Sequence, residues 1–175
     1  MAKGFAGEAA GFVCLQLAAL LFALRRIESK KREAACLASF CALLEQLKGA
    51  LGSEPAPMPE LLDALGTCCD GDAAAFVNLL AASMDRLGER SFRELWTDAL
   101  SAVPVTADRE SGRALLELGT VLGRYELNTQ LGAVESCRIV LSRRLDALCR
   151  ELPQAKRLTL GLCLAASALL GIILI

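Results

Sequence analysis

Cysteine is the residue type in this sequence that most suggests chemistry, because the chain has eight cysteines and no histidine. The lack of histidine removes the most common general acid or base and the most common metal ligand. No two cysteines have the CxxC spacing of zinc sites and redox motifs, and most fall on apolar helical positions. A thiol at such a position acts as a small apolar side chain in a reducing compartment, so we predict reduced, structural cysteines. The adjacent Cys68 and Cys69 leave a redox role open.

The segment Asp70-Gly71-Asp72 resembles the beginning of a calcium-binding loop. The next positions, Ala73 to Phe76, offer no side-chain oxygen as a further ligand. We therefore predict a turn, with Asp72 as the N-cap of the following helix. The sequence also lacks the GxxxxGK[ST] and GxSxG motifs. These observations predict a protein that is not an enzyme and that has no catalytic residue, metal, cofactor or small-molecule substrate.

Acidic residues are the other candidates for a functional surface. Between Gly49 and Asp85 the chain has six acids and no Lys or Arg. The six are Glu54, Glu60, Asp63, Asp70, Asp72 and Asp85. Solvated loops and helix N-termini are one explanation, because both favour acidic side chains. A docking surface for a basic partner is the other. Nucleic acid is not expected as a partner, since the net charge of the chain is −1.

The two ends of the chain are apolar. Residues 158–175 contain no charged residue, and as a helix they would be about 27 Å long, close to the roughly 30 Å hydrocarbon core of a bilayer. Residues 9–24 are also uncharged, with Glu8 just before them. We predict a transmembrane helix at each end. The alternatives are a buried helix of a soluble bundle at the C-terminus and a secretory signal peptide at the N-terminus.

Basic residues border both apolar segments on the side that faces the middle of the chain. They are Arg25-Arg26 and Lys156-Arg157. Because Lys and Arg mark the cytoplasmic side, we expect residues 25–157 in the cytoplasm and both termini outside. The predicted organisation is thus a transmembrane segment at 1–24, a cytoplasmic helical domain at 25–157 and a transmembrane segment at 158–175.

Helical periodicity dominates the middle of the chain, which is rich in alanine and leucine and poor in β-branched residues. A first helix is expected up to Gly52, where the proline-rich GSEPAPMPE begins. Ser91 and Glu94 form a capping box ahead of a helix that would place Trp96 in the core. Asp108 is expected to cap the next helix. The fold class is therefore all-α, a bundle of about six helices between the two transmembrane helices.

A long helix is predicted from Leu127 to Leu152, whose leucines and Val134 follow heptad spacing with Arg138 as the one exception. Pro153 should kink this helix or end it. Just before it, Gly119 and Gly123 are four residues apart and would share one helix face. We expect them to permit close approach of the helix that begins at Leu127, with a simple C-cap at Gly123 as the alternative.

The run LLELGTVLGRYELNTQLGAVESCRIVLSRRL, residues 115–145, resembles the stage III sporulation protein AB family, in which an L-G-x-x-L-G element precedes a glutamine and a long helix. The matching residues are Leu118, Gly119, Leu122, Gly123 and Gln130. The helix ELWTDAL, the Arg25-Arg26 pair after an apolar N-terminus and the apolar C-terminal helix extend the resemblance along the chain. The SEPAPMPE loop and Pro153 depart from the pattern.

This resemblance implies a non-enzymatic membrane scaffold of the sporulation channel that links mother cell and forespore. Such proteins are similar to the F-type platform proteins of type II secretion and type IV pilus systems. The expected partners are membrane lipid, a secretion-type ATPase and other membrane subunits of the channel. The expected location is the mother-cell or outer forespore membrane, with most of the chain cytoplasmic. The alternative is a small membrane-anchored adaptor or regulator unrelated to secretion.

Overall fold

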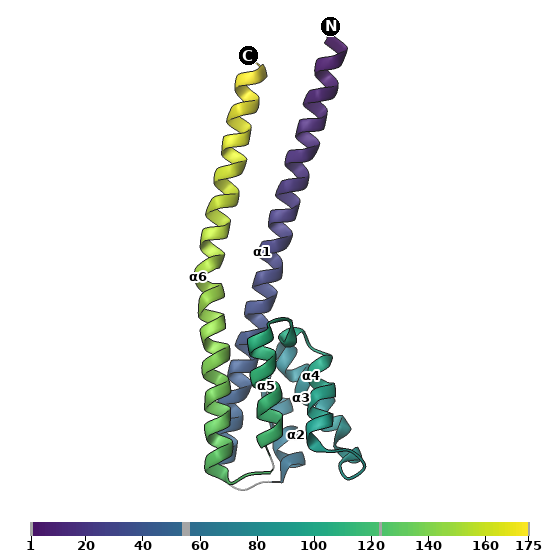
Figure 1. The fold of residues 1–175 in the computed structure, drawn as a ribbon, viewed down its shortest axis with the longest axis vertical. Coiled ribbons are helices and arrows are strands. Elements are labelled where there is room, and N and C mark those ends of the chain that lie inside the picture. The colour runs from purple at the N-terminus through teal and green to yellow at the C-terminus, as the bar shows by residue number, and fades with distance from the viewer. Residues whose placement is uncertain (1, 54–56, 123, 175) are drawn as a thin grey trace. The chain divides into compact units, whose positions relative to one another are not determined.

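The structure is a computed structural model (Figure 1), and it describes residues 2–53, 57–122 and 124–174. Within these ranges the side chains of residues 2–17, 19, 20, 53, 107, 154–160 and 162–174 are not described. Two predicted site residues, Glu54 and Gly123, lie outside the described residues.

Helices account for nearly all of the described chain. The elements are α1 (Ala2–Ser53), α2 (Met58–Cys68), α3 (Gly71–Ser83), the 3-10 helix η1 (Met84–Arg86), α4 (Phe92–Ser101), the 3-10 helix η2 (Pro104–Ala107), α5 (Arg109–Val121) and α6 (Leu127–Leu174). The described residues contain no strand, and an isolated bridge between Leu87 and Arg90 closes a turn. The predicted all-α class is confirmed.

The two longest helices, α1 and α6, include the apolar ends of the chain. α1 is one helix of 52 residues, because the junction RRIESKKREAA contains strong helix formers and no Gly or Pro. The expected bundle of about six helices is found, because parts of α1 and α6 join α2 to α5, but the two apolar ends are not separate helices. The described residues form six α-helices in all, and the apolar ends continue α1 and α6.

α6 also corrects the prediction that Pro153 could end the long helix. The helix runs from Leu127 to Leu174 with Pro153 inside it. Proline removes one backbone hydrogen bond from the helix, but good helix formers on both sides continue it.

One stretch among the described side chains, Leu21–Gly52, is long and apolar enough to cross a membrane, with a mean hydropathy of 1.3. A third of it is buried inside the structure, and a core helix of a soluble protein meets the same criteria. The described residues thus include one apolar helix near the N-terminus that is long enough to span a membrane. The two transmembrane segments at 1–24 and 158–175 remain predictions.

Backbone contacts divide the chain into two compact units. Unit 1 consists of Met1–Arg32 with Leu148–Ile175, and unit 2 is Glu33–Ala147. In unit 1, Ile27 of α1 and Leu148 of α6 are buried, and Lys30 forms an ion pair with Glu151. Unit 2 contains α2 to α5 together with parts of α1 and α6.

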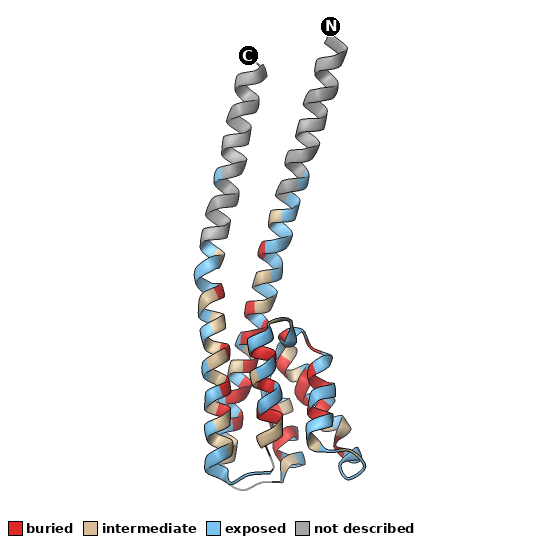
Figure 2. Cartoon of the chain, in the orientation of Figure 1, coloured by how far each residue is buried: buried red, intermediate tan, exposed pale blue. Residues whose placement is uncertain are grey.

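The core of unit 2 draws on every one of its α-helices, whose buried faces are red in Figure 2. Its largest fully buried side chains are Leu37, Phe40, Leu44, Phe76, Leu80, Leu95, Leu100, Leu115, Leu118, Leu122 and Leu141. A void of about 10 Å³ remains among the apolar side chains around Phe40 and Phe76, room for one water molecule at most. Unit 2 is therefore closely packed inside.

Ion pairs fix how α1 and α6 run past each other in unit 2. Glu33 pairs with Arg144 at 2.7 Å, and Lys48 pairs with Glu135 at 2.9 Å. The later residue of α1, Lys48, pairs with the earlier residue of α6, Glu135. The two helices are therefore antiparallel. Arg138, the exception in the heptad pattern, is 31% exposed and binds Glu135 on its own helix and Glu45 on α1. It occupies the edge of the helix contact with its charge paired.

Candidate functional site

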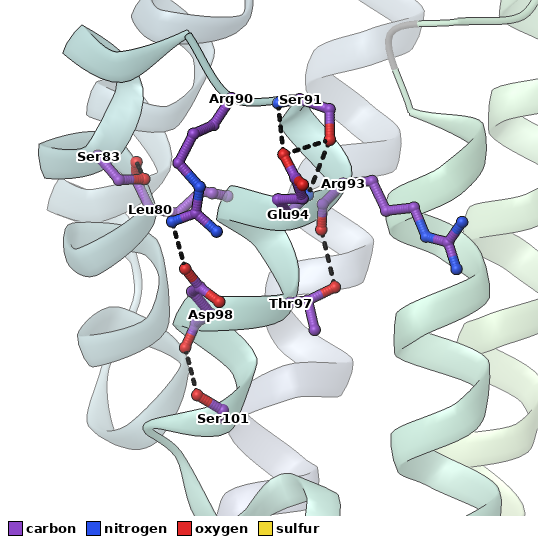
Figure 3. A network of polar contacts seen from close by, with 9 residues as sticks. All are labelled: Leu80, Ser83, Arg90, Ser91, Arg93, Glu94, Thr97, Asp98 and Ser101. Atoms are coloured by element: carbon purple, nitrogen blue, oxygen red, sulfur yellow. Dashed lines mark hydrogen bonds and ion pairs between the residues drawn. The ribbon is translucent and has the colours of Figure 1, made fainter.

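The tryptophan helix α4 begins with the predicted capping box. The Ser91 hydroxyl accepts a hydrogen bond from the Glu94 backbone N–H at 3.4 Å, and the Glu94 carboxylate accepts one from the Ser91 N–H at 2.9 Å (Figure 3). The backbone and hydroxyl hydrogen bonds from Ser91 hold the pKa of Glu94 below its usual value. Arg90 pairs with Asp98 on the same helix, whereas the Arg93 side chain points away from this pair (Figure 3). These contacts fix the start and orientation of α4.

Trp96 lies in the core, as predicted, with 4% of its surface exposed. Its indole N–H donates a hydrogen bond to the Leu115 carbonyl of α5 at 2.8 Å. The Phe76 ring meets it edge to face, with 4.8 Å between ring centroids, and the Phe92 ring lies at 5.7 Å. Trp96 thus joins α3, α4 and α5 through one side chain.

Gly119 on α5 lies directly against the indole of Trp96. A Cβ atom at this position would lie 2.3 Å from Trp96 Cδ1 and 2.5 Å from Cγ, far inside van der Waals contact. The expectation of close packing at Gly119 is confirmed, but its neighbour differs from the prediction. The side chain that requires the glycine is Trp96 of α4, and not the helix that begins at Leu127.

The other motif residues shape the end of α5 and the beginning of α6. Leu118 and Leu122 are buried, and Leu122 is the C-cap of α5. Gln130, in the first turn of α6, donates a side-chain hydrogen bond to the Tyr125 carbonyl at 2.7 Å. These residues hold the turn that reverses the chain between α5 and α6.

The acidic residues are distributed over two helices and η1. Glu60 and Asp63 are exposed one turn apart on α2, Asp70 is exposed at the N-cap position of α3, and Asp85 is exposed in η1. Asp85 comes thirteen positions after Asp72, with helical and 3-10 structure between them, which corresponds to roughly 20 Å along the chain direction. The sequence stretch therefore yields several exposed acids along α2 and α3, and not one compact cluster.

Asp72 has a different environment from the one predicted. It lies inside the first turn of α3 and is half-buried, while Asp70 takes the N-cap position without a side-chain capping bond. The helix can begin at Gly71 because this residue has a φ of +64°, which glycine adopts without strain. The prediction of Asp72 as N-cap is therefore wrong, since the sequence pattern does not reveal the positive φ of Gly71.

The described cysteines are all free thiols, with Cys36 and Cys137 buried in unit 2. Burial raises the pKa of Cys137 to about 12, and burial together with the Asp72 carboxylate raises the pKa of Cys36 to about 12. Burial also raises the pKa of Cys69, whose thiol donates to the Gln46 side chain. Thiols with raised pKa values are weak nucleophiles at neutral pH. Among the described residues, no group of His, Cys, Asp and Glu is placed to hold a metal ion.

A family model, stage III sporulation protein AB, matches residues 8–175. The chain belongs to this family. No curated protein and no solved structure matches the chain. Membership in the stage III sporulation protein AB family makes it a sporulation protein.

In this member of the stage III sporulation protein AB family, packing explains the residues of the L-G-x-x-L-G element. Leu118 and Leu122 are buried on the core face of α5, and Gly119 beside them receives the Trp96 indole. The ELWTDAL helix and the L-G-x-x-L-G element are thus two halves of one contact, formed between α4 and α5.

Sequence reasoning predicted Asp108 as a cap but missed the residues around it. The Asp108 carboxylate accepts hydrogen bonds from the Ser111 N–H at 2.9 Å and the Ser111 hydroxyl at 2.7 Å, and Arg144 of α6 lies 3.4 Å away. Ser111 is completely buried. The three-residue spacing from Asp108 to Ser111 is a sequence signal for this cap, whereas nothing in the sequence indicates Arg144.

Proposed function

We propose that this protein is a non-enzymatic membrane scaffold of the sporulation channel, and that it presents a cytoplasmic helical domain to a secretion-type ATPase. Membership in the stage III sporulation protein AB family supports the sporulation role. The membrane role rests on the surface of α1 just before Arg25.

That surface carries large apolar side chains that face solvent. Leu21, Phe22 and Leu24 are 59%, 69% and 50% exposed, and exposed Arg25 and Arg26 follow directly. Exposing several large apolar side chains to water in a row is costly, at about 25 cal/mol for each Å². Lipid tails would cover Leu21, Phe22 and Leu24, and the two arginines would lie at the level of the headgroups. This abrupt change from apolar to basic surface is the observation that carries the proposal.

We also propose that the protein lies in the mother-cell or outer forespore membrane, with residues 25–157 on the cytoplasmic side. Family membership supports the sporulating cell as its setting, and the basic residues that border both apolar segments support the orientation. Both apolar ends are parts of helices that also supply the core of unit 2. A scaffold of this kind would hold unit 2 at the membrane through two continuous helices, next to other membrane subunits of the channel.

The docking surface for the ATPase is proposed along α2 and the beginning of α3. Glu60, Asp63 and Asp70 are exposed, and residues 57–85 contain no Lys or Arg to neutralise them. Acidic side chains that remain in solvent attract a basic protein surface over a Debye length of about 8 Å in physiological salt. Asp72 contributes less, because it is half-buried against Cys36.

The scaffold role predicts a gene for a P-loop ATPase next to the gene of this protein. Binding of the full chain in detergent to that ATPase tests the proposal. The variant E60Q/D63N/D70N should bind about tenfold more weakly at low salt, with the difference shrinking at high salt. The control variant E89Q/E110Q/E126Q removes the same charge from exposed acids outside this surface. Wild-type affinity of the first variant would exclude the acidic surface, and no binding by the wild-type chain would favour an adaptor that acts without the ATPase.

A further inference from the structure

Unit 1 carries a concentration of positive charge next to its apolar helix ends. Residues 25–32 and 150–157 together contain eight Lys or Arg and two acids, a net charge of +6. The whole chain has a net charge of −1. The bases are Arg25, Arg26, Lys30, Lys31, Arg32, Arg150, Lys156 and Arg157, which we call the basic band.

Both acids of this region already have basic partners. Glu151 pairs with Lys30 at 2.5 Å, and Glu28 pairs with Arg32 at 3.3 Å. Four exposed bases of the band, Arg25, Arg26, Lys31 and Arg150, form no ion pair with any described side chain. Their charges are therefore available to an anionic ligand.

The contact between Lys30 and Glu151 also aligns the two helices of unit 1. Because α1 and α6 are antiparallel, Lys31 comes level with Arg150, and Arg25 comes level with Lys156. From Arg25 to Arg32 the band extends about 10 Å along the helix axis, at 1.5 Å for each residue. Successive residues turn by about 100°, so Arg25, Arg26 and Lys31 face different directions around α1. These three bases therefore surround α1 and do not form a single stripe along it.

We propose that the basic band binds the phosphodiester headgroups of anionic phospholipids, an inference that rests on the membrane anchoring proposed above. The band begins directly after the exposed Leu24, where α1 would leave the hydrocarbon. The headgroup layer is about 5–8 Å thick on each side of the bilayer, and long basic side chains can bend toward it along their apolar stems. Arginine binds phosphate oxygens through two parallel N–H groups. Each base near an anionic surface strengthens association about fivefold.

The test uses the full chain reconstituted into vesicles of phosphatidylcholine and phosphatidylglycerol. Electron paramagnetic resonance of spin-labelled lipids measures how strongly each lipid associates with the protein. The test variant is R25Q/R26Q/K31Q/R150Q. The control variant, R86Q/R93Q/R109Q/R124Q, removes the same charge from exposed arginines of unit 2 that form no ion pair with a described side chain and lie outside the band.

The wild-type chain and the control variant should prefer phosphatidylglycerol about fivefold or more at low salt, and the test variant should fall to within twofold of no preference. Soluble glycerophosphate should not compete with phosphatidylglycerol for the basic band. Competition would mean that the band binds a free phosphate compound, and it would overturn the proposal. Equal preference in all three proteins would also overturn it. Alkaline extraction separates the two proposals: a chain that stays in the vesicles without lipid preference refutes only the lipid site, whereas a chain that is extracted refutes the anchoring and the lipid site together.

Discussion

At the scale of single residues, Trp96 and Gly119 show why the stage III sporulation protein AB family member combines a tryptophan helix with a glycine motif. The indole fills the space that any side chain at position 119 would need, and its N–H satisfies the Leu115 carbonyl at the same time. The rings of Phe76 and Phe92 each pack against the indole. The pair is a packing contact, so its loss affects stability first.

Replacing Gly119 by alanine should destabilise the protein. The new Cβ would meet Trp96 at 2.3 Å, and overpacking of this kind costs about 1–3 kcal/mol. At roughly 2–4 °C for each kcal/mol in a chain of this length, the thermal midpoint of the full chain in detergent should fall by about 2–12 °C. Fluorescence of Trp96, the one tryptophan in the chain, reports the transition.

The matched control is Gly132→Ala on α6. A Cβ at position 132 meets nothing within 4 Å, so the better helix propensity of alanine should keep or raise the midpoint. An unchanged midpoint for Gly119→Ala would show that α4 and α5 move apart at little cost and that the motif has another purpose.

The structural role of a residue was predictable from the sequence where a local pattern specifies it. It was not predictable where the role depends on a neighbour that is distant in the sequence. The capping box at Ser91 and the cap at Asp108 follow from spacings of three residues, and both are present. Close packing at Gly119 was expected correctly, but the sequence could not show that Trp96 of α4 is the neighbour. Asp72 was misplaced because the conformation of Gly71 shifted the start of α3 toward Asp70.

At the scale of elements, charge pairs join the first and last helices of unit 2. Glu135 on α6 accepts hydrogen bonds from Arg138 at 2.6 Å and from Lys48 of α1 at 2.9 Å. The hydrogen bonds from Arg138 and then Lys48 lower the pKa of Glu135 from 4.5 to about 2. The carboxylate stays charged in the folded protein down to a pH at which it would be protonated in the unfolded chain.

This shift predicts a specific acid sensitivity. Because the folded pKa is depressed, the contribution of Glu135 to stability is present above pH 4.5 and is lost as the pH falls toward 2. Glu135→Gln should lower the thermal midpoint at pH 7 and flatten its decline between pH 4.5 and 2. Circular dichroism at a series of pH values measures both effects. The control is Glu126→Gln, which changes an exposed acid that forms no ion pair among the described residues and should retain the wild-type pH profile. If the thermal midpoint of Glu135→Gln declines as steeply as that of the wild type, other carboxylates cause the acid sensitivity.

Element boundaries were predicted well where strong breakers occur and poorly where helix formers are continuous. The proline-rich segment after Ser53 ends α1 close to the expected position. No comparable break separates the apolar ends from the bundle, so α1 and α6 are each one helix where the sequence suggested two. A proline inside a run of helix formers, as at position 153, did not decide where α6 ends.

At the scale of the whole molecule, the predicted topology can be tested in intact sporulating cells. In a chain without its native cysteines, single cysteines placed at Ala2 and after Ile175 should react with a membrane-impermeant thiol reagent, because both basic flanks face the middle of the chain. A cysteine at the exposed Pro57 should react only after the membrane is permeabilised. A protected terminus together with a reactive position 57 would reverse the orientation.

The antiparallel pairing of α1 with α6 also has a consequence for biosynthesis. About 70 residues separate the end of α1 from the beginning of α6, which corresponds to roughly 4–15 s of translation. During this time the surface of α1 around Lys48 and Glu33 lacks its partners on α6. Apolar residues such as Leu37 and Phe40 must wait for later helices before they are fully covered. A nascent chain that stalls before Leu127 is therefore an incomplete bundle with exposed apolar surface. Chaperones and proteases recognise species of this kind.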